Sequence, residues 1–426
     1  MCTTYEIDGR VSSLDQITKL RCLETFRALS KEGFRAVAVA YKSVAKPGGF
    51  TAADECELTL AGFLSFADPL LPGIAESIDA LRRDGVEVKI ITGDNELVTR
   101  HICSQAGIDG GRIVLGSEIE RLDEAAFARV VAQANVFARV SPAQKHRIIR
   151  SLKAAGHVVG FLGDGINDAP SLHAADVGIS AGGAVDVARE ASDIILLERR
   201  LDVLHAGITA GRKSFGNVLK YLLMGTSSNF GNMFSMAGAS LFLPFLPMLP
   251  AQILLNNFLY DFAQITIPTD NIDPVYIRRP QRWDVRLIRN FMLIIGPVSS
   301  LYDFLTFFVL LYLFRFGEVL FHTGWFLESL ATQTLVLFVI RTAGRPWANP
   351  PSKPLIVTTL LVVLIGAILP YTAVAVPLGL ASLPGTYFLF LGVVIATYLA
   401  IVELVKEKVM RRLLSSSEPT SFITMP

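Results

Sequence analysis

The chain has 426 residues, of which 51% are hydrophobic, and its mean hydropathy is +0.47. This apolar composition argues against a wholly soluble protein, and a formal net charge of +1 gives no electrostatic reason to expect a nucleic-acid partner. The four cysteines are widely spaced and form no CxxC pair, which argues against a cysteine-based zinc site or a disulfide framework.

The first 58 residues predict only a small mixed segment. A helix is expected over residues 14–28, and the alternating, β-branched run FRAVAVAY predicts a strand over residues 34–41. One helix and one or two strands are too few to form a core of their own. We therefore expect residues 1–58 to be the remainder of a larger domain.

Short apolar runs then alternate with helical stretches as far as residue 200. Such alternation predicts a doubly wound parallel sheet with right-handed crossovers, in a domain over residues 59–213. Its strands are expected at residues 58–66, 86–92, 113–115, 136–139, 158–162, 177–179 and 193–197.

The most informative stretch, GDGIND, follows the apolar run at residues 158–162. It is a glycine-bracketed turn, and Pro170 suits the first turn of the helix that follows. Because ligands bind at the carboxyl ends of strands in open α/β sheets, Asp164 and Asp168 would meet there and repel unless a cation joined them. Mg²⁺ takes oxygen ligands and commonly accompanies phosphate, so both aspartates are predicted metal ligands and Asn167 an orienting group. The alternative is a polar turn without a metal.

Two other segments place phosphate-binding groups at strand ends. Thr92, Gly93 and Asp94 follow the strand at 86–92, where a hydroxyl and nearby amides suit a phosphoryl oxygen; a plain turn is the alternative. Lys145 lies three residues after Pro142, within the first turn of a helix, where it would neutralise phosphate charge unless it is a surface lysine. Together with the aspartates, these residues indicate phosphoryl transfer.

Residues 214–412 predict an all-α bundle of six membrane spans. Spans are expected at 215–243, 251–268, 287–314 and 325–341, with two more in the uncharged stretch between Lys353 and Glu403. Arginines and lysines crowd the loops on one side, including Arg278, Arg279, Arg282 and Arg286, so both ends of the bundle and the α/β domain are expected in the cytoplasm. Residues 413–426 are expected to be a disordered tail.

Polar side chains within the first two spans define a candidate ion site. Asn257, Asp261 and Gln264 follow i, i+4, i+7 spacing, and Asn229 and Asn232 recur with Ser235 at three-residue steps. An ionised Asp within a bilayer usually faces a pathway or a partner. The alternative is a hydrogen-bond cluster between helices. For Asp303, on the next span, a pair with Arg289 or a polar contact is expected.

The order TGDN, VSPAQK and GDGINDAPSLHAADVGIS resembles the phosphorylation domain of P-type ATPases, which has a haloacid-dehalogenase-like fold. The stretches TSSNFGNMFSMAGASLFLPFLPMLP and NNFLYDFAQITIPTDNIDP resemble spans five and six of the magnesium-transporting branch. The resemblance implies a pump in a plasma or inner membrane that hydrolyses ATP with catalytic Mg²⁺ and moves a divalent cation, Mg²⁺ by import.

The resemblance also implies parts that are missing from this sequence. No DKTG motif is present, so the aspartate that accepts the γ-phosphate is missing, and the chain is expected to be a C-terminal half that does not phosphorylate itself. A separate chain that carries the missing N-terminal half is among the expected partners, with ATP, a divalent cation and the lipid bilayer. Alternatives are a non-catalytic membrane fragment or subunit, a pump for another divalent cation such as Ca²⁺, and a membrane-anchored phosphatase, which the missing nucleophile disfavours.

Overall fold

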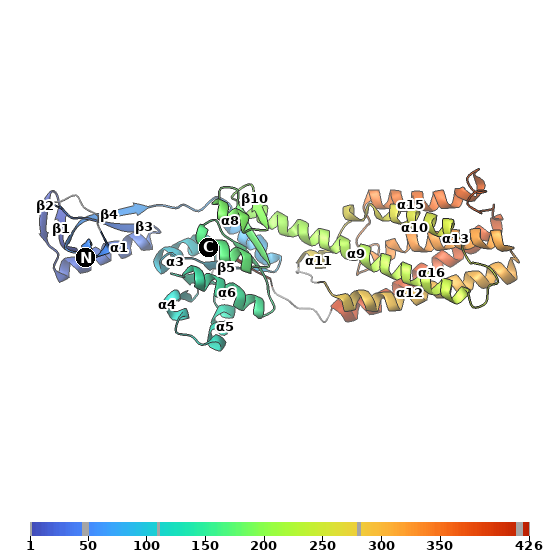
Figure 1. Ribbon diagram of the computed structural model, residues 1–426, viewed down its shortest axis with the longest axis horizontal. Coiled ribbons are helices and arrows are strands. Elements are labelled where there is room, and N and C mark those ends of the chain that lie inside the picture. The colour runs from blue at the N-terminus through green and yellow to red at the C-terminus, as the bar shows by residue number, and fades with distance from the viewer. Residues whose placement is uncertain (1, 45–50, 109–110, 279–282, 415–420, 426) are drawn as a thin grey trace. The chain divides into compact units, whose positions relative to one another are not determined.

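The computed structural model describes residues 2–44, 51–108, 111–278, 283–414 and 421–425. The chain divides into two compact units, Met1–Gly207 with Pro419–Pro426, and Ile208–Glu418. Figure 1 labels their helices and strands. Arg279 and Arg282, which carry part of the expected charge asymmetry, lie outside the described residues.

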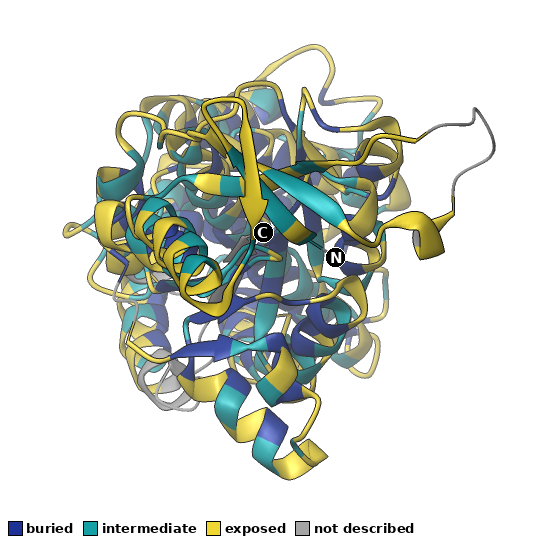
Figure 2. Ribbon diagram, turned by 90° about the vertical axis from the view of Figure 1, so that its left-hand side faces the viewer, coloured by how far each residue is buried: buried dark blue, intermediate teal, exposed yellow. Residues whose placement is uncertain are grey.

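The first unit begins with a four-stranded sheet in the order β2-β1-β4-β3. Its elements are β1 (Cys2–Ile7), β2 (Arg10–Ser13), α1 (Gln16–Lys31), β3 (Arg35–Tyr41) and β4 (Leu58–Phe66). The expectation that β4 belongs to the following parallel sheet is wrong, because β4 pairs with β1 and β3. Its residues are half-buried or exposed, as Figure 2 shows for much of this sheet, whereas strands of a two-sided parallel sheet are buried on both faces.

A seven-stranded sheet follows in the order β10-β9-β8-β11-β5-β7-β6, and all its pairs are parallel. This confirms the predicted doubly wound fold. The strands are β5 (Val86–Ile91), β6 (Ile113–Leu115), β7 (Val136–Ala138), β8 (Val158–Leu162), β9 (Val177–Ala181), β10 (Ile194–Leu196) and β11 (Ser421–Met425). The helices are α2 (Ile74–Arg83), α3 (Glu96–Gln105), α4 (Gly116–Ile119), α5 (Glu124–Gln133), α6 (Pro142–Ala154), α7 (Ala169–Ala174) and α8 (Asp186–Glu190). Ile91, Phe137, Ile148 and Phe161 are central members of the buried core.

The expected disorder of the tail is wrong for residues 421–425, which form β11 in the middle of this sheet. β11 pairs on one side with β5, Ser421 opposite Val86, and on the other with β8, Ser421 opposite Val158. The run SFITM is uncharged and rich in strand-forming residues, and the gap between β5 and β8 offers backbone partners on both sides. Residues 415–420 lie outside the described residues.

The second unit is a helical bundle around two apolar clusters. Its helices are α9 (Leu201–Ala239, which begins in the first unit), α10 (Pro250–Gln264), α11 (Pro274–Arg278), α12 (Val285–Phe308), α13 (Glu318–Leu335), α14 (Leu337–Ile340), α15 (Lys353–Ile368) and α16 (Gly385–Leu414). Phe321, Trp325, Phe326, Leu330 and Tyr387 are almost fully buried in one cluster. This packing leaves α13 enclosed by its neighbours.

Within the described residues, four segments are long and apolar enough to cross a membrane: Val285–Leu313, Glu318–Ile340, Lys353–Tyr371 and Gly385–Lys408. They correspond to the last four expected spans. The first two, α9 and α10, are not among them: α10 has 15 residues, and the C-terminal half of α9 is rich in Ser, Asn and Gly. Six spans therefore stay a prediction.

Candidate phosphoryl-transfer site

Lys145 and Asp168 form a buried ion pair beside the carboxyl end of β8. Lys145 Nζ donates to Asp168 Oδ1 over 2.8 Å, and the two residues are 8% and 4% exposed. A capping box begins α6, since Ser141 and Gln144 each bond the other's backbone N–H through their side chains, and Pro142 occupies the first turn. The local sequence thus fixes the start of α6, and with it the position of Lys145.

The GDGIND turn holds Asp168 from the other side. The backbone N–H of Gly165 donates to Asp168 Oδ2 over 3.2 Å. A Cβ at Gly163 would lie 2.7 Å from the Cβ of Asp168, so only glycine fits at that position. Both carboxylate oxygens of Asp168 therefore have donors within the protein, one from Lys145 and one from Gly165.

Asp164 and Asn167, in the same turn, are exposed. The Asp164 side chain is 60% exposed, and its Oδ2 lies 4.0 Å from Nη2 of Arg199. Asp164 thus has free lone pairs for a cation, whereas Asp168 is already engaged. In the described part of the chain no three acidic, histidine or cysteine side chains gather around one point, but Mg²⁺ is often held by one or two carboxylates together with phosphate and water. The donor set fits Mg²⁺ on Asp164.

Thr92 directly follows β5, the strand on the other side of β11 from β8. Its backbone bonds both to Phe137 and to Val140 at the end of β7, and its hydroxyl accepts from the N–H of Asp94 over 3.2 Å. The Asp94 carboxylate accepts from Arg35 Nη2 over 2.6 Å, and Gly93 is exposed. Thr92 and the GDGIND turn lie at the same edge of the sheet, flanking β11, but no hydrogen bond among the described residues joins the two groups.

The candidate transport residues divide between the surface and the interior of the helical unit. Asn229, Asn257 and Asp261 are exposed, and no hydrogen bond to another side chain forms at any of them in the described part of the chain. Asn232 is half-buried and accepts from Gln333 Nε2 of α13 over 3.0 Å. Gln264 is buried, with both amide atoms lacking a partner among the described residues. The five residues therefore do not share one environment, and no hydrogen bond among the described residues joins any two of them.

Sequence reasoning missed a buried polar residue in the same helix. Asn256, beside the predicted Asn257, is 3% exposed, and its Nδ2 donates to Ser329 Oγ over 3.3 Å. Spacing alone identified a polar stripe on α10 but not which side of the helix would be covered, and the neighbouring asparagines lie about 100° apart around the axis.

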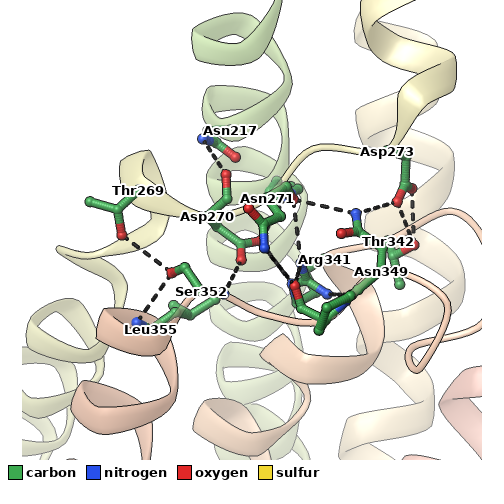
Figure 3. Close-up of polar contacts among 12 residues, drawn as sticks. Asn217, Thr269, Asp270, Asn271, Asp273, Arg341, Thr342, Asn349, Ser352 and Leu355 are labelled. Carbon is green, nitrogen blue, oxygen red and sulfur yellow. Dashed lines mark hydrogen bonds and ion pairs between the residues drawn. The ribbon is translucent and has the colours of Figure 1, made fainter.

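A second missed group lies in the loop after α10 (Figure 3). Asp270 accepts from Lys220 Nζ over 2.7 Å, from Arg341 Nε over 2.8 Å and from the N–H of Ser352 over 3.0 Å. Asp273 accepts from Thr342, Ala343 and Asn349. We call Lys220, Asp270, Asp273 and Arg341 the loop cluster. The stretch TDNIDP, with two carboxylates between apolar runs, was the available signal.

Comparison with known proteins decides the family. One family model, haloacid dehalogenase-like hydrolase, matches residues 16–176, and a second, cation transporting ATPase C-terminus, matches residues 245–407. The chain is 44% identical over 418 residues to the magnesium-transporting ATPase, P-type 1, of Escherichia coli (strain K12), covering 97% of this chain and 46% of that protein. The chain belongs to the P-type cation-transporting ATPase family.

Sequence identity to other relatives differs with the cation that their names give. A magnesium-transporting ATPase, P-type 1, of Salmonella typhimurium (strain LT2) is 45% identical over 418 residues, again 97% of this chain and 46% of the relative. The calcium-transporting ATPase 1 of Bacillus cereus is 31% identical over 285 residues, 66% of this chain and 32% of the relative. The chain thus spans about half the length of the magnesium-transporting relatives and is more similar to them than to this calcium-transporting one.

Proposed function

We propose that this chain is the phosphorylation and ion-pathway portion of an ATP-driven pump that imports Mg²⁺. The observation that carries the proposal is the buried Lys145–Asp168 pair beside the exposed Asp164, at the sheet edge that also holds Thr92. Fixed cationic and hydrogen-bonding groups at such an edge stabilise a transferring phosphoryl group, and the likeness to magnesium-transporting relatives supports the choice of ion.

Each residue of this edge has a proposed part. Asp164 holds the catalytic Mg²⁺, which when bound neutralises charge on the phosphate oxygens. Asp168 orients the ammonium group of Lys145 toward the edge, and Asn167 orients the phosphoryl group. The Thr92 hydroxyl, which keeps its own proton to donate, and the N–H of Gly93 bind phosphoryl oxygens, and the N–H of Asp94 orients that hydroxyl. The acceptor aspartate comes from outside this sequence, in the remaining length that the relatives have or in a separate partner chain.

The exposed polar stripe of Asn229, Asn257 and Asp261 is the proposed ion site. A carboxylate facing lipid costs several kcal/mol, so this face is covered in the working protein. One carboxylate with amide oxygens suits a partly hydrated Mg²⁺, held through one or two carboxylates, better than Ca²⁺, which takes six to eight oxygens. Asn232 and Gln264 lie deeper in the bundle and serve as neutral acceptors along the path.

We also propose where the pump works. The bundle lies in the plasma or inner membrane, and six spans place the α/β unit and both chain ends in the cytoplasm, where ATP is available. The crowding of arginine and lysine in alternate loops supports this orientation.

A chimera tests the proposal with the chain in its working context. The 418 matching residues of the Escherichia coli relative are replaced by those of this chain, and the chimera is expressed in a strain deficient in Mg²⁺ uptake. We expect growth at limiting Mg²⁺ and an acid-stable phosphoenzyme. Asp164→Asn should reduce the phosphoenzyme by orders of magnitude, whereas Asp261→Asn should abolish growth rescue and spare phosphorylation.

The exposed Asp79 of α2 provides a matched control, since Asp79→Asn should leave growth and phosphorylation unchanged. Growth rescue by Asp261→Asn would place the ion site elsewhere, with Gln264 or Asp303 the next candidates. Calcium uptake without magnesium uptake would favour the calcium-transporting alternative, to which the 31% identical relative belongs.

A further inference from the structure

Two carboxyl groups are enclosed together in the helical unit, away from the proposed ion stripe. Asp303 lies on α12 and Glu328 on α13, and they are 2% and 1% exposed. The sequence left two expectations for Asp303, an ion pair with Arg289 or a polar contact. The structure shows the polar contact, and Asp303 forms no ion pair with Arg289 among the described residues. The two side chains lie in hydrogen-bonding contact with each other.

The surroundings of Asp303 consist of hydrogen-bond donors. Ser235 Oγ of α9 donates to Asp303 Oδ2 over 2.5 Å, and Trp325 Nε1 of α13 donates to Asp303 Oδ1 over 2.8 Å. A tryptophan N–H has no lone pair to offer a metal ion. Asp303 is therefore held as an acceptor, and its two oxygens are already occupied by donors.

No cation in the described part of the chain balances the pair. Neither carboxyl forms an ion pair with a lysine, arginine or histidine there, and Glu328 Oε2 is buried without a donor. Among the described residues, the other titratable groups that interact electrostatically with the pair are two phenols of α16, Tyr387 with Glu328 and Tyr398 with both carboxyls, and phenols are neutral near pH 7. Two ionised carboxylates in contact, both buried and without a cationic side chain beside them, would repel strongly.

We propose that Asp303 and Glu328 form a proton-binding site between α12 and α13, with the proton on Glu328. The Glu328 O–H then donates to the carboxylate of Asp303, which gains a third donor. The remaining Glu328 oxygen becomes a neutral carbonyl, which is cheaper to leave unpaired than a carboxylate oxygen. The ligand is a proton rather than a metal ion because the groups around Asp303 are donors. This proposal does not depend on which cation is pumped.

Infrared spectroscopy of the 426-residue chain in lipid nanodiscs at pH 7 tests the site. The wild type should show the carbonyl stretch of a protonated carboxylic acid, shifted in D₂O, and Glu328→Gln should lack it. Glutamine also donates an N–H to Asp303, so this variant should fold. Glu318→Gln, at the exposed start of the same helix, is the matched control and should keep the band.

A second variant checks the assignment of the acceptor. Trp325→Phe removes one donor from Asp303, so the carboxylate becomes a stronger acceptor and the Glu328 band should move to lower frequency. The proposal is overturned if Glu328→Gln removes a carboxylate band instead of a carboxylic-acid band. It is equally overturned if the wild type holds a stoichiometric metal ion that Glu328→Gln loses.

Discussion

Lys145 and Asp168 each need the other's charge, because both side chains are buried and water does not solvate either of them freely. Their side chains are 11% and 6% exposed. Lys153, also on α6, pairs with Asp176, which directly precedes β9, and these two side chains are 35% and 37% exposed. Removing one partner of a buried pair leaves an uncompensated charge, while an exposed pair contributes little.

We therefore expect Lys145→Met to destabilise the α/β unit by about 3 kcal/mol, by analogy with other broken buried pairs. Thermal unfolding in detergent, followed by circular dichroism, is the measurement. Lys153→Met is the control and should cost less than about 1 kcal/mol. The double variant Lys145→Met with Asp168→Leu should recover most of the lost stability. Equal thermal midpoints for Lys145→Met and Lys153→Met would show that burial does not set the contribution of the pair to stability.

At the scale of elements, β11 closes the seven-stranded sheet through its backbone. Ile423 pairs with Val88 on one side and with Gly160 on the other. A proline inside a central strand removes a ladder hydrogen bond, but it is tolerated at the first residue of a strand.

Ile423→Pro should thus release β11 and speed amide hydrogen exchange in both β5 and β8. Ser421→Pro, at the start of the same strand, should change exchange much less. Mass spectrometry of peptides from both strands measures the effect. Equal protection of β5 and β8 in both variants and the wild type would mean that these strands do not rely on β11.

Sequence reasoning succeeded for elements whose signal is local. The strand–turn–helix around GDGIND and the start of α6 follow from apolar runs, glycines, Pro142 and Pro170, which act within a few residues. Sequence reasoning failed for β4 and β11, because the sheet to which a strand belongs is decided by its pairing partners. Both have ordinary strand sequences, and their partners lie in distant parts of the chain. Glu328 was missed because residues 325–341 were considered only as one apolar span, without asking which face of the helix each side chain takes.

At the scale of the whole molecule, the loop cluster ties together segments that are distant in the chain, from Lys220 on α9 to Arg341 after α14, and Asp270 also accepts from the N–H of Ser352 before α15. Burial of Asp270 opposes its ionisation, but the hydrogen bonds from Arg341 and Lys220 outweigh this effect and hold the pKa of Asp270 below its ordinary value. A carboxyl whose pKa is lower in the folded state contributes stability above the unfolded pKa of about 3.9.

That stability should disappear as the pH falls below about 4 and through the pKa of folded Asp270. The thermal midpoint of the helical unit in detergent should fall over this range. Asp270→Asn should be less stable at pH 7, by about 3 kcal/mol, and lose less on acidification. Asp261→Asn, at an exposed carboxylate of the same unit, should follow the wild-type curve; identical acid responses of all three proteins would remove Asp270 as the cause.

The direction of β11 has a practical consequence for handling this protein. The strand runs parallel to β5 and β8, and its last residue, Met425, pairs with Ile90, two residues before Thr92. Any affinity tag or fluorescent reporter appended to the C-terminus would emerge over the edge that holds Thr92 and the GDGIND turn. Purification handles and topology reporters are therefore better attached before Cys2, where the adjoining strand β1 belongs to the other sheet.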